Sequence, residues 1–352
     1  MIPIKNIYHM LTYAFQVLKQ KNYRKIETEE FKNTEDLFAE ILKLGLSSQI
    51  KRGLEKEYIT RNESSSTLRG KINITQSLKQ NTLQQRQLIC TYDDLSINTY
   101  KNQIIKTTLL ALIAKDIDKS RKKEIKNLLL YLDEVDTIDI HRINWNLHYN
   151  RNNQTYMMLL SVCELTVKGL LQTHEEGTTK IMDFEEKVMS HLYEKFIFNY
   201  YQQEHPELKV NAYQIKWAGT TDEDYDNMLP IMQTDITLQK DNKILIIDAK
   251  YYQHITNTRN EHTTVRSAHL YQIFAYVKNM DANTNYTNTI SGMLLYAKTD
   301  KDELQEYTYN MSGNKISVKT LNLNVEFNKI REQLDSIAHE YFNNNNLNQE
   351  EH

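Results

Sequence analysis

Glycine, proline and cysteine are scarce in this chain of 352 residues, which contains 8, 3 and 2 of them respectively. None of the glycines lies in a G-x-x-x-x-G-K-[ST] pattern, the loop that cradles nucleotide phosphates, so a standard nucleoside-triphosphate motor is excluded. The two cysteines, Cys90 and Cys163, are far apart and form no C-x-x-C pair. This spacing argues against a zinc site or a disulfide framework and fits a reducing compartment.

Long apolar runs and a strong net charge are missing as well. No stretch approaches the ~20 apolar residues of a membrane-spanning helix, and the N-terminus lacks a secretory signal pattern. We therefore expect a cytoplasmic protein with no membrane contact. The 43 basic and 46 acidic residues give a formal net charge of −3, so any contact with DNA must be local or shared with a partner.

The most informative stretch of the sequence runs from residue 229 to residue 250. Alternating residues at 231–239 and a branched apolar run at 244–247 predict two strands. The cluster of turn-forming residues at 240–243 lies between them. We therefore expect a hairpin here.

The register of that hairpin decides which side chains meet. If the turn is a four-residue loop, Gln239 faces Ile244, and Asp235 faces Asp248 across the pair of strands. Lys250 then projects from the same face as Asp248, because side chains alternate along a strand. Two buried carboxylates are costly unless they are compensated, and a divalent cation between them is a simple compensation.

Asp235 followed by Asp248-Ala249-Lys250 matches the D…D-x-K pattern of the PD-(D/E)XK nucleases. Carboxylate oxygens suit Mg²⁺, which activates a bound water and stabilises charge on a phosphodiester. The two anions favour the charged form of Lys250, so we assign it to positioning water and stabilising charge. Taken alone, D-x-K is equally compatible with an acid and a lysine at the surface end of a strand.

A predicted helix at residues 267–278 supplies a further polar pair. Apolar residues recur there at helical spacing, and Ser267 is a candidate N-cap. Gln272 and Tyr276 lie four residues apart on one side, a Q-x-x-x-Y arrangement that resembles the corresponding helix in RecB-like nucleases. The alternative is an amphipathic helix with a polar edge. In the nuclease interpretation Gln272 orients the site.

The helix expected at residues 184–201 offers an acidic side chain for the same site. The nuclease core begins with such a helix, which can contribute a third metal ligand. Glu194 is the first candidate and Glu186 is the reserve, and for either one a solvated surface glutamate is the alternative.

Three histidines, His254, His262 and His269, lie near the predicted site in the sequence. Because Mg²⁺ prefers oxygen ligands, we interpret them as facing solvent or DNA. The polar, basic segment 253–266 suits either a loop that contacts phosphate or a disordered loop.

The first half of the chain contains both helical and strand-like sequence patterns. Helices are expected near residues 4–18 and after residue 34, and again from residue 93; strands are expected at 57–60, 68–74 and 87–92, with a polar loop at 62–67. We therefore predict an α+β N-terminal domain with a small β-rich insertion, at residues 1–175.

The second half has the order of a nuclease core. A helix is followed by a strand at 210–217, the hairpin, the helix with Gln272, and a strand at 292–297. A hairpin at 305–321 and a helix at 325–342 close the domain. We therefore predict an α/β PD-(D/E)XK domain, related to restriction endonucleases, at residues 176–352.

The whole chain resembles the McrC family. The strings that carry the resemblance are IPIKNIYHMLTYAF, LRGKI, YDDLSINTYKNQIIKTTL, LPIMQTDITL, ILIIDAKYY, AHLYQIFAYV and GMLLYA, in this order. The resemblance implies a Mg²⁺-dependent DNA endonuclease subunit of a restriction system directed at 5-methylcytosine, in which Asp235, Asp248 and Lys250 match the catalytic positions. It also implies an McrB-like AAA+ GTPase hexamer as partner. That partner binds the GTP and recognises modified cytosine in double-stranded DNA, while the N-terminal part of McrC docks into the ring and stimulates GTP hydrolysis.

A different class of function fits part of the same pattern. The chain could be a non-catalytic interaction protein that only regulates an AAA+ GTPase ring, with an idle nuclease fold. The intact set of Asp235, Asp248 and Lys250 argues against such decay. A single-strand binder would need a basic, aromatic groove that the composition does not indicate.

Overall fold

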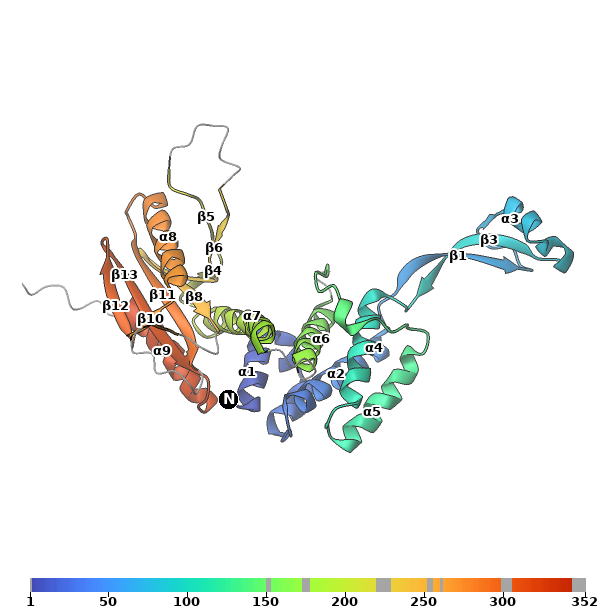
Figure 1. Cartoon of the computed structure of the whole chain (residues 1–352), viewed down its shortest axis with the longest axis horizontal. Helices are drawn as coiled ribbons and strands as arrows, with labels where there is room; N and C mark the ends of the chain where they lie inside the picture. The colour runs from blue at the N-terminus through green and yellow to red at the C-terminus, as the bar shows by residue number, and fades with distance from the viewer. Residues whose placement is uncertain are drawn as a thin grey trace, which may run out of the picture. The chain divides into compact units, whose positions relative to one another are not determined.

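The computed structural model describes residues 2–149, 153–172, 178–219, 229–251, 256–259, 262–298 and 306–343. The chain forms two compact units: unit 1 is Met1–Glu27 with Gln172–His352, and unit 2 is Thr28–Leu171 (Figure 1). The predicted boundary near residue 175 lies close to the second of these junctions. Residues 1–27 were predicted as part of the N-terminal domain, but they pack within unit 1.

The first helix, α1 (Ile4–Ala14), shows why the N-terminus belongs to unit 1. The Asn6 side-chain amide donates hydrogen bonds to the carbonyl oxygens of Leu323 and Val325, at 2.8 and 2.7 Å. The His9 ring stacks on Phe327 at 4.5 Å between centroids. These contacts join positions more than 300 residues apart, which no local pattern in the sequence indicates.

A mixed six-stranded sheet forms the centre of unit 1, with strand order β12-β13-β11-β8-β7-β4. The long central strand β11 runs parallel to β8 and β13, whereas the other neighbouring pairs are antiparallel. The strands are β4 (Lys209–Asn211), β7 (Ile236–Lys240), β8 (Lys243–Lys250), β11 (Thr289–Lys298), β12 (Tyr307–Met311) and β13 (Asn314–Asn322). Two short hairpins accompany them, β5 (Gln214–Ile215) with β6 (Met232–Gln233) and β9 (Thr256–Arg259) with β10 (His262–Val265).

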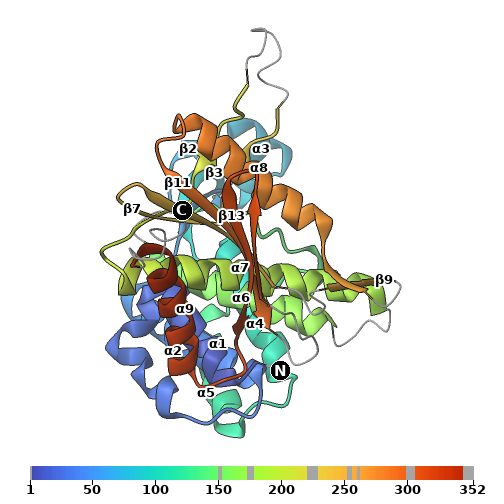
Figure 2. The same ribbon diagram turned by 90° about the vertical axis from the view of Figure 1, so that its left-hand side faces the viewer.

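Helices cover both faces of this sheet (Figure 2). The helix α8 (Ser267–Asn283) packs Ile273 and Val277 against apolar side chains of β8 and β11 on one face. On the other face, Tyr193 of α7 (Thr178–Glu204) donates a hydrogen bond to the Leu295 carbonyl oxygen at 3.5 Å. The helix α9 (Phe327–Phe342) covers that face too, through a hydrogen bond between Tyr341 and Ser317. Unit 1 is therefore a mixed α/β fold.

The strand predicted at residues 231–239 is interrupted in the structure. Thr234 separates β6 from β7 because its backbone and side chain both pair with Tyr213: the Thr234 N–H donates to the Tyr213 carbonyl oxygen at 3.0 Å, and the Tyr213 N–H donates to Thr234 Oγ1 at 2.8 Å. The strand predicted at 210–217 is likewise divided into β4 and β5. The break at Thr234 leaves the next residue, Asp235, at the open end of β7.

Four α-helices form the body of unit 2: α2 (Thr34–Arg52), α4 (Tyr100–Ile113), α5 (Lys119–Leu129) and α6 (Gln154–Gln172). Short 3-10 turns lie between elements of the chain, at Gln16–Lys19, Lys21–Thr28, Thr82–Gln85, Leu130–Leu132 and Ile140–Arg142. The helix predicted from residue 93 begins only at Tyr100, where the Thr99 side chain caps it. No described helix is long and apolar enough to cross a lipid bilayer.

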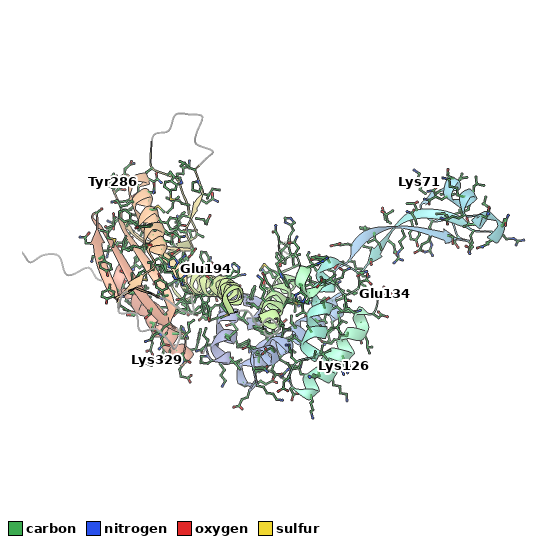
Figure 3. The ribbon with its side chains drawn as sticks, in the orientation of Figure 1. Lys71, Lys126, Glu134, Glu194, Tyr286 and Lys329 are labelled. Carbon is green, nitrogen blue, oxygen red and sulfur yellow. The ribbon has the colours of Figure 1, made fainter. Side chains whose placement is uncertain are left out.

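Three antiparallel strands leave this helical body as what we call the arm, residues 57–96. The strand β1 (Glu57–Ser65) pairs along its whole length with β3 (Leu88–Ser96), and β2 (Lys71–Ile72) adds to the other edge of β3. A short helix, α3 (Ile74–Lys79), packs on β3. Figure 3 shows Lys71 in the distal part of the arm and Lys126 on α5 in the body.

The arm differs in detail from the strands predicted for it. Residues 62–65 were predicted as a loop, but they belong to β1, because Asn62 pairs with Thr91 in the ladder. Most of the strand predicted at 68–74 is absent, and only Lys71–Ile72 pairs. Gly70, directly before this pair, has a φ of +60° in the left-handed region.

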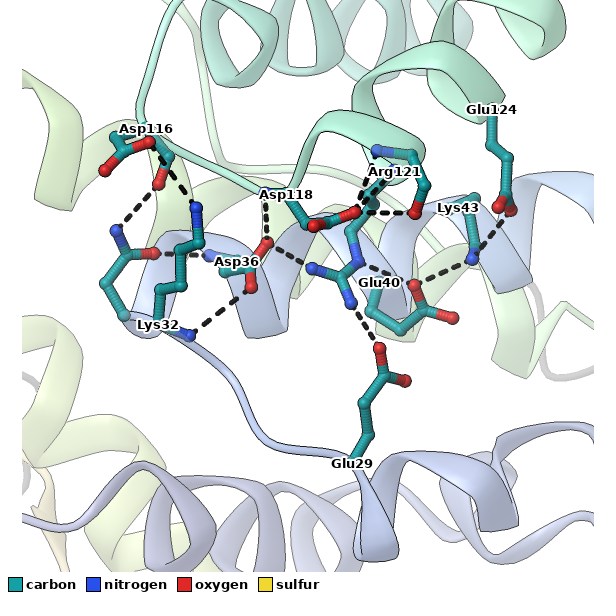
Figure 4. A network of polar contacts seen from close by, with 11 residues as sticks. Glu29, Lys32, Asp36, Glu40, Lys43, Asp116, Asp118, Arg121 and Glu124 are labelled. Atoms are coloured by element: carbon teal, nitrogen blue, oxygen red, sulfur yellow. Dashed lines mark hydrogen bonds and ion pairs between the residues drawn. The ribbon is translucent and has the colours of Figure 1, made fainter.

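A network of buried charges joins α2 to α5 in unit 2 (Figure 4). Arg121 on α5 has a relative exposure of 4% and donates from Nε to Glu40 at 2.7 Å. Its other nitrogens donate to Asp36 and to Glu29. Lys43 adds a second cation 2.7 Å from Glu40. Each buried acid of the network therefore faces a positive charge, as buried charges require.

Candidate active site

The ladder between β7 and β8 places the two aspartates. Gln239 pairs with Ile244, as the sequence predicted, although the connecting loop is tighter than the four residues expected, because Lys240 and Lys243 also pair. The last pair of the ladder, Ile236 with Ile247, is next to the aspartates. Continuing it by one step sets Asp235 opposite Asp248.

Hydrogen bonds and burial then fix these two carboxylates. Asp235 Oδ2 accepts the backbone N–H of Ala249 at 3.0 Å. Asp248 has a relative exposure of 0%, and among the described residues no well-oriented donor reaches either of its carboxylate oxygens. Lys250 Nζ lies 2.9 Å from Asp248 Oδ2. A carboxylate in such a position retains strong attraction for a further positive charge.

Helix α8 brings its polar pair to Lys250. The Lys250 ammonium donates to Gln272 Oε1 at 3.3 Å, and Gln272 Nε2 donates to the Tyr276 hydroxyl at 2.9 Å. The predicted Q-x-x-x-Y side of the helix therefore faces the D-x-K strand. The predicted cap at Ser267 is wrong by one residue, since Arg266 is the N-cap and makes no side-chain hydrogen bond to the helix.

Burial sets the electrostatics of the two aspartates. It raises the pKa of Asp235 and of Asp248 above the ordinary value for an aspartate, and the charge of Lys250 opposes that rise in both. The pKa of Asp248 is raised further by the negative charge of Asp235. Without additional positive charge, holding both groups ionised is unfavourable.

Glu194 lies on α7 (Figure 3), close enough to the site for the charges of Asp235 and Lys250 to act on it. Burial, followed by the negative charge of Asp235, raises the pKa of Glu194 to about 7, while a hydrogen bond from Ser190 and the charge of Lys250 lower it. Ser190 Oγ lies 3.0 Å from Glu194 Oε1. Glu194 and Asp235 line one open cavity of about 370 Å³, together with His191, Lys195, Phe198 and Asn199.

The oxygen donors of this site fit a hard divalent cation. Among the residues that the structure describes, no well-oriented donor reaches the buried Asp248 oxygens, and Asp235 and Glu194 offer further oxygens to the same region. Among the described residues, no three His, Cys, Asp or Glu side chains lie close enough together to form a complete metal-binding group. Asp235 and Asp248 are thus a pair, with Glu194 nearby. The side chain of the reserve candidate, Glu186, lies outside the described residues.

The interpretation of His269 as facing solvent or DNA is wrong. His269 is 8% exposed, and its Nδ1 lies 2.8 Å from the hydroxyl of the buried Tyr296. Burial, with the nearby charges of Lys250 and Arg266, lowers the pKa of His269 to about 4. His254 and the side chain of His262 lie outside the described residues.

Sequence reasoning missed several residues beside the site. Ser190 was detectable, because it precedes Glu194 by four positions, the spacing at which helical neighbours meet. The pairing of His269 with Tyr296 joins α8 to β11 across the fold, and no spacing in the sequence signals it. Lys195, which lines the cavity and lies over the Phe15 ring at 4.2 Å, depends likewise on the distant α1 region.

Comparison with known proteins assigns the chain to a family. The family model described as "McrBC 5-methylcytosine restriction system component" matches residues 5–297. The chain is a member of the McrBC family. It is 30% identical over 345 residues to the type IV methyl-directed restriction enzyme EcoKMcrBC of Escherichia coli (strain K12). The matched region covers 97% of this chain and 98% of that protein.

A solved structure agrees with this McrBC assignment at the level of the fold. It is a half-complex from a tetradecameric assembly of Thermococcus gammatolerans McrB AAA+ hexamers with bound McrC. The match has a TM-score of 0.50 and 18% sequence identity, and it covers 95% of this chain and 76% of that chain. The part of the chain matched by the McrBC family model contains Glu194, Asp235, Asp248, Lys250 and Gln272.

Proposed function

We propose that the chain is the Mg²⁺-dependent endonuclease subunit of a restriction complex that cuts DNA containing methylcytosine, and that unit 1 is a PD-(D/E)XK nuclease. The observation that carries this proposal is the fully buried Asp248 carboxylate, which lies 2.9 Å from the Lys250 ammonium and is acted on by the negative charge of Asp235. Asp235, placed opposite it by the strand ladder, supplies the second acid of the nuclease pattern.

Asp235, Asp248 and Glu194 are the residues that would hold the Mg²⁺ ion. When bound, the ion would lower the pKa of a coordinated water and stabilise negative charge on the scissile phosphodiester. Its charge would also offset the burial that raises the pKa values of these three carboxyl groups.

The remaining side chains have roles of their own in the proposed reaction. Lys250 stays protonated beside the two aspartates and presents its charge to the phosphate and the attacking water. Gln272 orients the Lys250 ammonium, and Tyr276 holds the Gln272 amide. The Ala249 N–H keeps Asp235 directed toward the end of β8. Side chains and backbone on the strands and on α8 thus hold each of these groups in place.

A second part of the proposal concerns the partner. We infer that unit 2 docks on an McrB-like AAA+ GTPase hexamer and stimulates its GTP hydrolysis, and that the partner binds both the GTP and the modified cytosine. Related proteins support this, because the Thermococcus gammatolerans assembly contains McrB hexamers with bound McrC. A reaction that needs cellular GTP and DNA takes place in the cytoplasm.

Cleavage of a methylated plasmid tests the proposal. The chain, its GTPase partner, GTP and Mg²⁺ should together linearise a methylated plasmid, while omission of the chain, of Mg²⁺ or of methylation should leave the plasmid intact. GTP hydrolysis that rises on addition of the chain without any cutting would favour a purely regulatory protein and contradict the nuclease assignment.

A further inference from the structure

We infer that Asn102 is the positioning residue that locks the arm to the helical body of unit 2, and that this lock lets contact at the arm act on the partner's GTP hydrolysis. The second half of the inference rests on the proposed function; the first half does not. Asn102 lies on α4, in the first turn after the arm, and has a relative exposure of 0%.

The Asn102 amide group joins both strands of the arm at their base. Its Nδ2 donates one hydrogen bond to the carbonyl oxygen of Glu55, at 3.0 Å, and another to that of Ile97, at 2.8 Å. Glu55 lies two residues before β1, and Ile97 directly follows β3. A single side chain therefore holds the chain where it enters the arm and where it leaves.

Tyr156 of α6 completes the lock from the other side. Its hydroxyl donates to Asn102 Oδ1 at 2.8 Å and accepts the backbone N–H of Glu55, also at 2.8 Å. The Asn102 amide thus uses both N–H groups and its oxygen in the buried cluster. A buried network with every member satisfied is rigid and specifies one arrangement.

An ion pair supports the entering strand. Lys101 Nζ lies 2.7 Å from Glu55 Oε1, and the two side chains are only 17% and 19% exposed. The arm beyond this point has no comparable anchor among the described residues, because β1 is largely exposed along its length. The direction of the arm is therefore set at its base, by Asn102 and its neighbours.

The orientation of the arm matters for its effect on the partner. The arm is attached to the body at its base alone, so its distal end has a fixed position only if the base cannot rotate. An arm with a loose base can still touch a partner, but it cannot favour one partner conformation over another with the same free energy. Loss of the lock should therefore reduce stimulation more than it reduces binding.

The substitution Asn102→Asp tests the lock with a minimal change in size. It keeps the oxygen that accepts from Tyr156 but removes both N–H donors and sets a carboxylate against two carbonyl oxygens. Tyr156→Phe is the milder companion, since it removes one hydroxyl and retains the two bonds from Nδ2. Asn62→Asp makes the same chemical change on the arm itself, away from the base, and serves as the control.

Distances between spin labels at Lys79→Cys on the arm and Lys126→Cys on α5 measure the lock directly. Both positions are exposed, and the native cysteines, Cys90 and Cys163, are fully buried, which protects them from labelling. We expect a narrow distance distribution for the parent and for Asn62→Asp, a broad one for Asn102→Asp, and an intermediate one for Tyr156→Phe. The inference would be overturned if Tyr156→Phe had a distance distribution as narrow as that of the parent and Asn102→Asp were folded with an equally narrow distribution.

Measurement of the partner's GTP hydrolysis tests the second half of the inference, the coupling between the arm and the partner. At saturating concentrations of the full-length chain, Asn102→Asp should lower the stimulated GTP turnover roughly 10-fold, within the usual range of coupling between sites, while the concentration giving half-maximal stimulation changes little. If Asn102→Asp does not fold, Tyr156→Phe should show a smaller loss of the same kind. Full stimulation by a variant with a broad distance distribution would overturn the coupling. A parent chain that gives no stimulation would instead refute the proposed function and leave the distance result standing.

Discussion

Lys250 and Asp248 lie two residues apart on β8 and bring an ammonium nitrogen to 2.9 Å from a carboxylate oxygen with no exposure to solvent. A single lysine does not balance the charges around it, because Asp235 and Glu194 face the same region and burial raises the pKa of all three acids. Lys195 lines the cavity as well, so among the described residues of the site three acids face two lysines. In the proposed function a divalent cation supplies further positive charge.

The third acid of the site can be identified by exchanging two glutamates of α7. Glu194→Gln should lower the rate of cleavage by about 10- to 100-fold, the loss typical when a metal site is weakened. Glu186→Gln is the matched control and should cut like the parent. The readout is the rate of plasmid cleavage at limiting Mg²⁺; an equal loss in both variants, or a loss only in Glu186→Gln, would refute the assignment of Glu194.

Binding of metal should depend on pH because Glu194 has a pKa of about 7. Below this pH the carboxyl group is protonated and must lose its proton to bind a cation, so affinity should rise as pH increases through about 7. We expect Mn²⁺ affinity, measured by electron paramagnetic resonance, to increase by at least about 10-fold between about pH 6 and pH 8, because the raised pKa of Asp248 adds a second carboxyl group that must lose its proton. The rise should be smaller in Glu194→Gln, and an identical rise would contradict the role given to Glu194.

The close approach of α8 to β11 depends on Gly292. A Cβ atom at this position would lie 2.8 Å from Val277 Cγ2 and 2.9 Å from Ile273 Cγ1, which is too close for an ordinary contact. Gly292→Ala should therefore destabilise unit 1 by about 1–3 kcal/mol and shift the helix that carries Gln272. Gly219→Ala, which meets nothing within 4 Å, is the control. Urea unfolding checks the prediction, and equal midpoints for the two variants would count against it.

Arg121 should be the most sensitive charged residue of unit 2. Arg121→Met would leave Asp36 and Glu40 buried beside one fewer cation, which costs about 3–5 kcal/mol when a buried ion pair is broken from one side. Arg142→Met, at a side chain that is 87% exposed, should change stability by less than about 0.5 kcal/mol. Hydrogen exchange of the α2 amides measures the difference. Protection in Arg121→Met equal to that of the parent would show that the network contributes little.

The sequence was most informative where the periodicity of a strand or a helix determines which side chains lie next to one another. The alternation of residues around the hairpin predicted that Gln239 faces Ile244, and helical spacing predicted that Gln272 and Tyr276 share one side of α8. The position of Asp235 at the open end of β7 was only partly predictable, because the break at Thr234 depends on hydrogen bonds to Tyr213, 21 residues away.

Other features depended on contacts that no local pattern encodes. His269 looked like a polar surface residue, yet α8 turns it toward Tyr296 on β11. Asn62 lies in a polar stretch typical of a loop, but pairing with β3 keeps it in a strand. The packing of α1 in unit 1 is decided by Asn6 and residues more than 300 positions later. In each case tertiary contacts override the local propensity.

The most direct test of the central claim compares two aspartates near opposite ends of the hairpin. With the GTPase partner, GTP and Mg²⁺ present, Asp248→Asn should reduce cleavage of methylated plasmid to background while still stimulating GTP hydrolysis fully. Asp241→Asn, in the exposed turn between β7 and β8, should cut and stimulate like the parent. Normal cleavage by Asp248→Asn, or an equal loss of cleavage in both variants, would contradict the assignment of the active site.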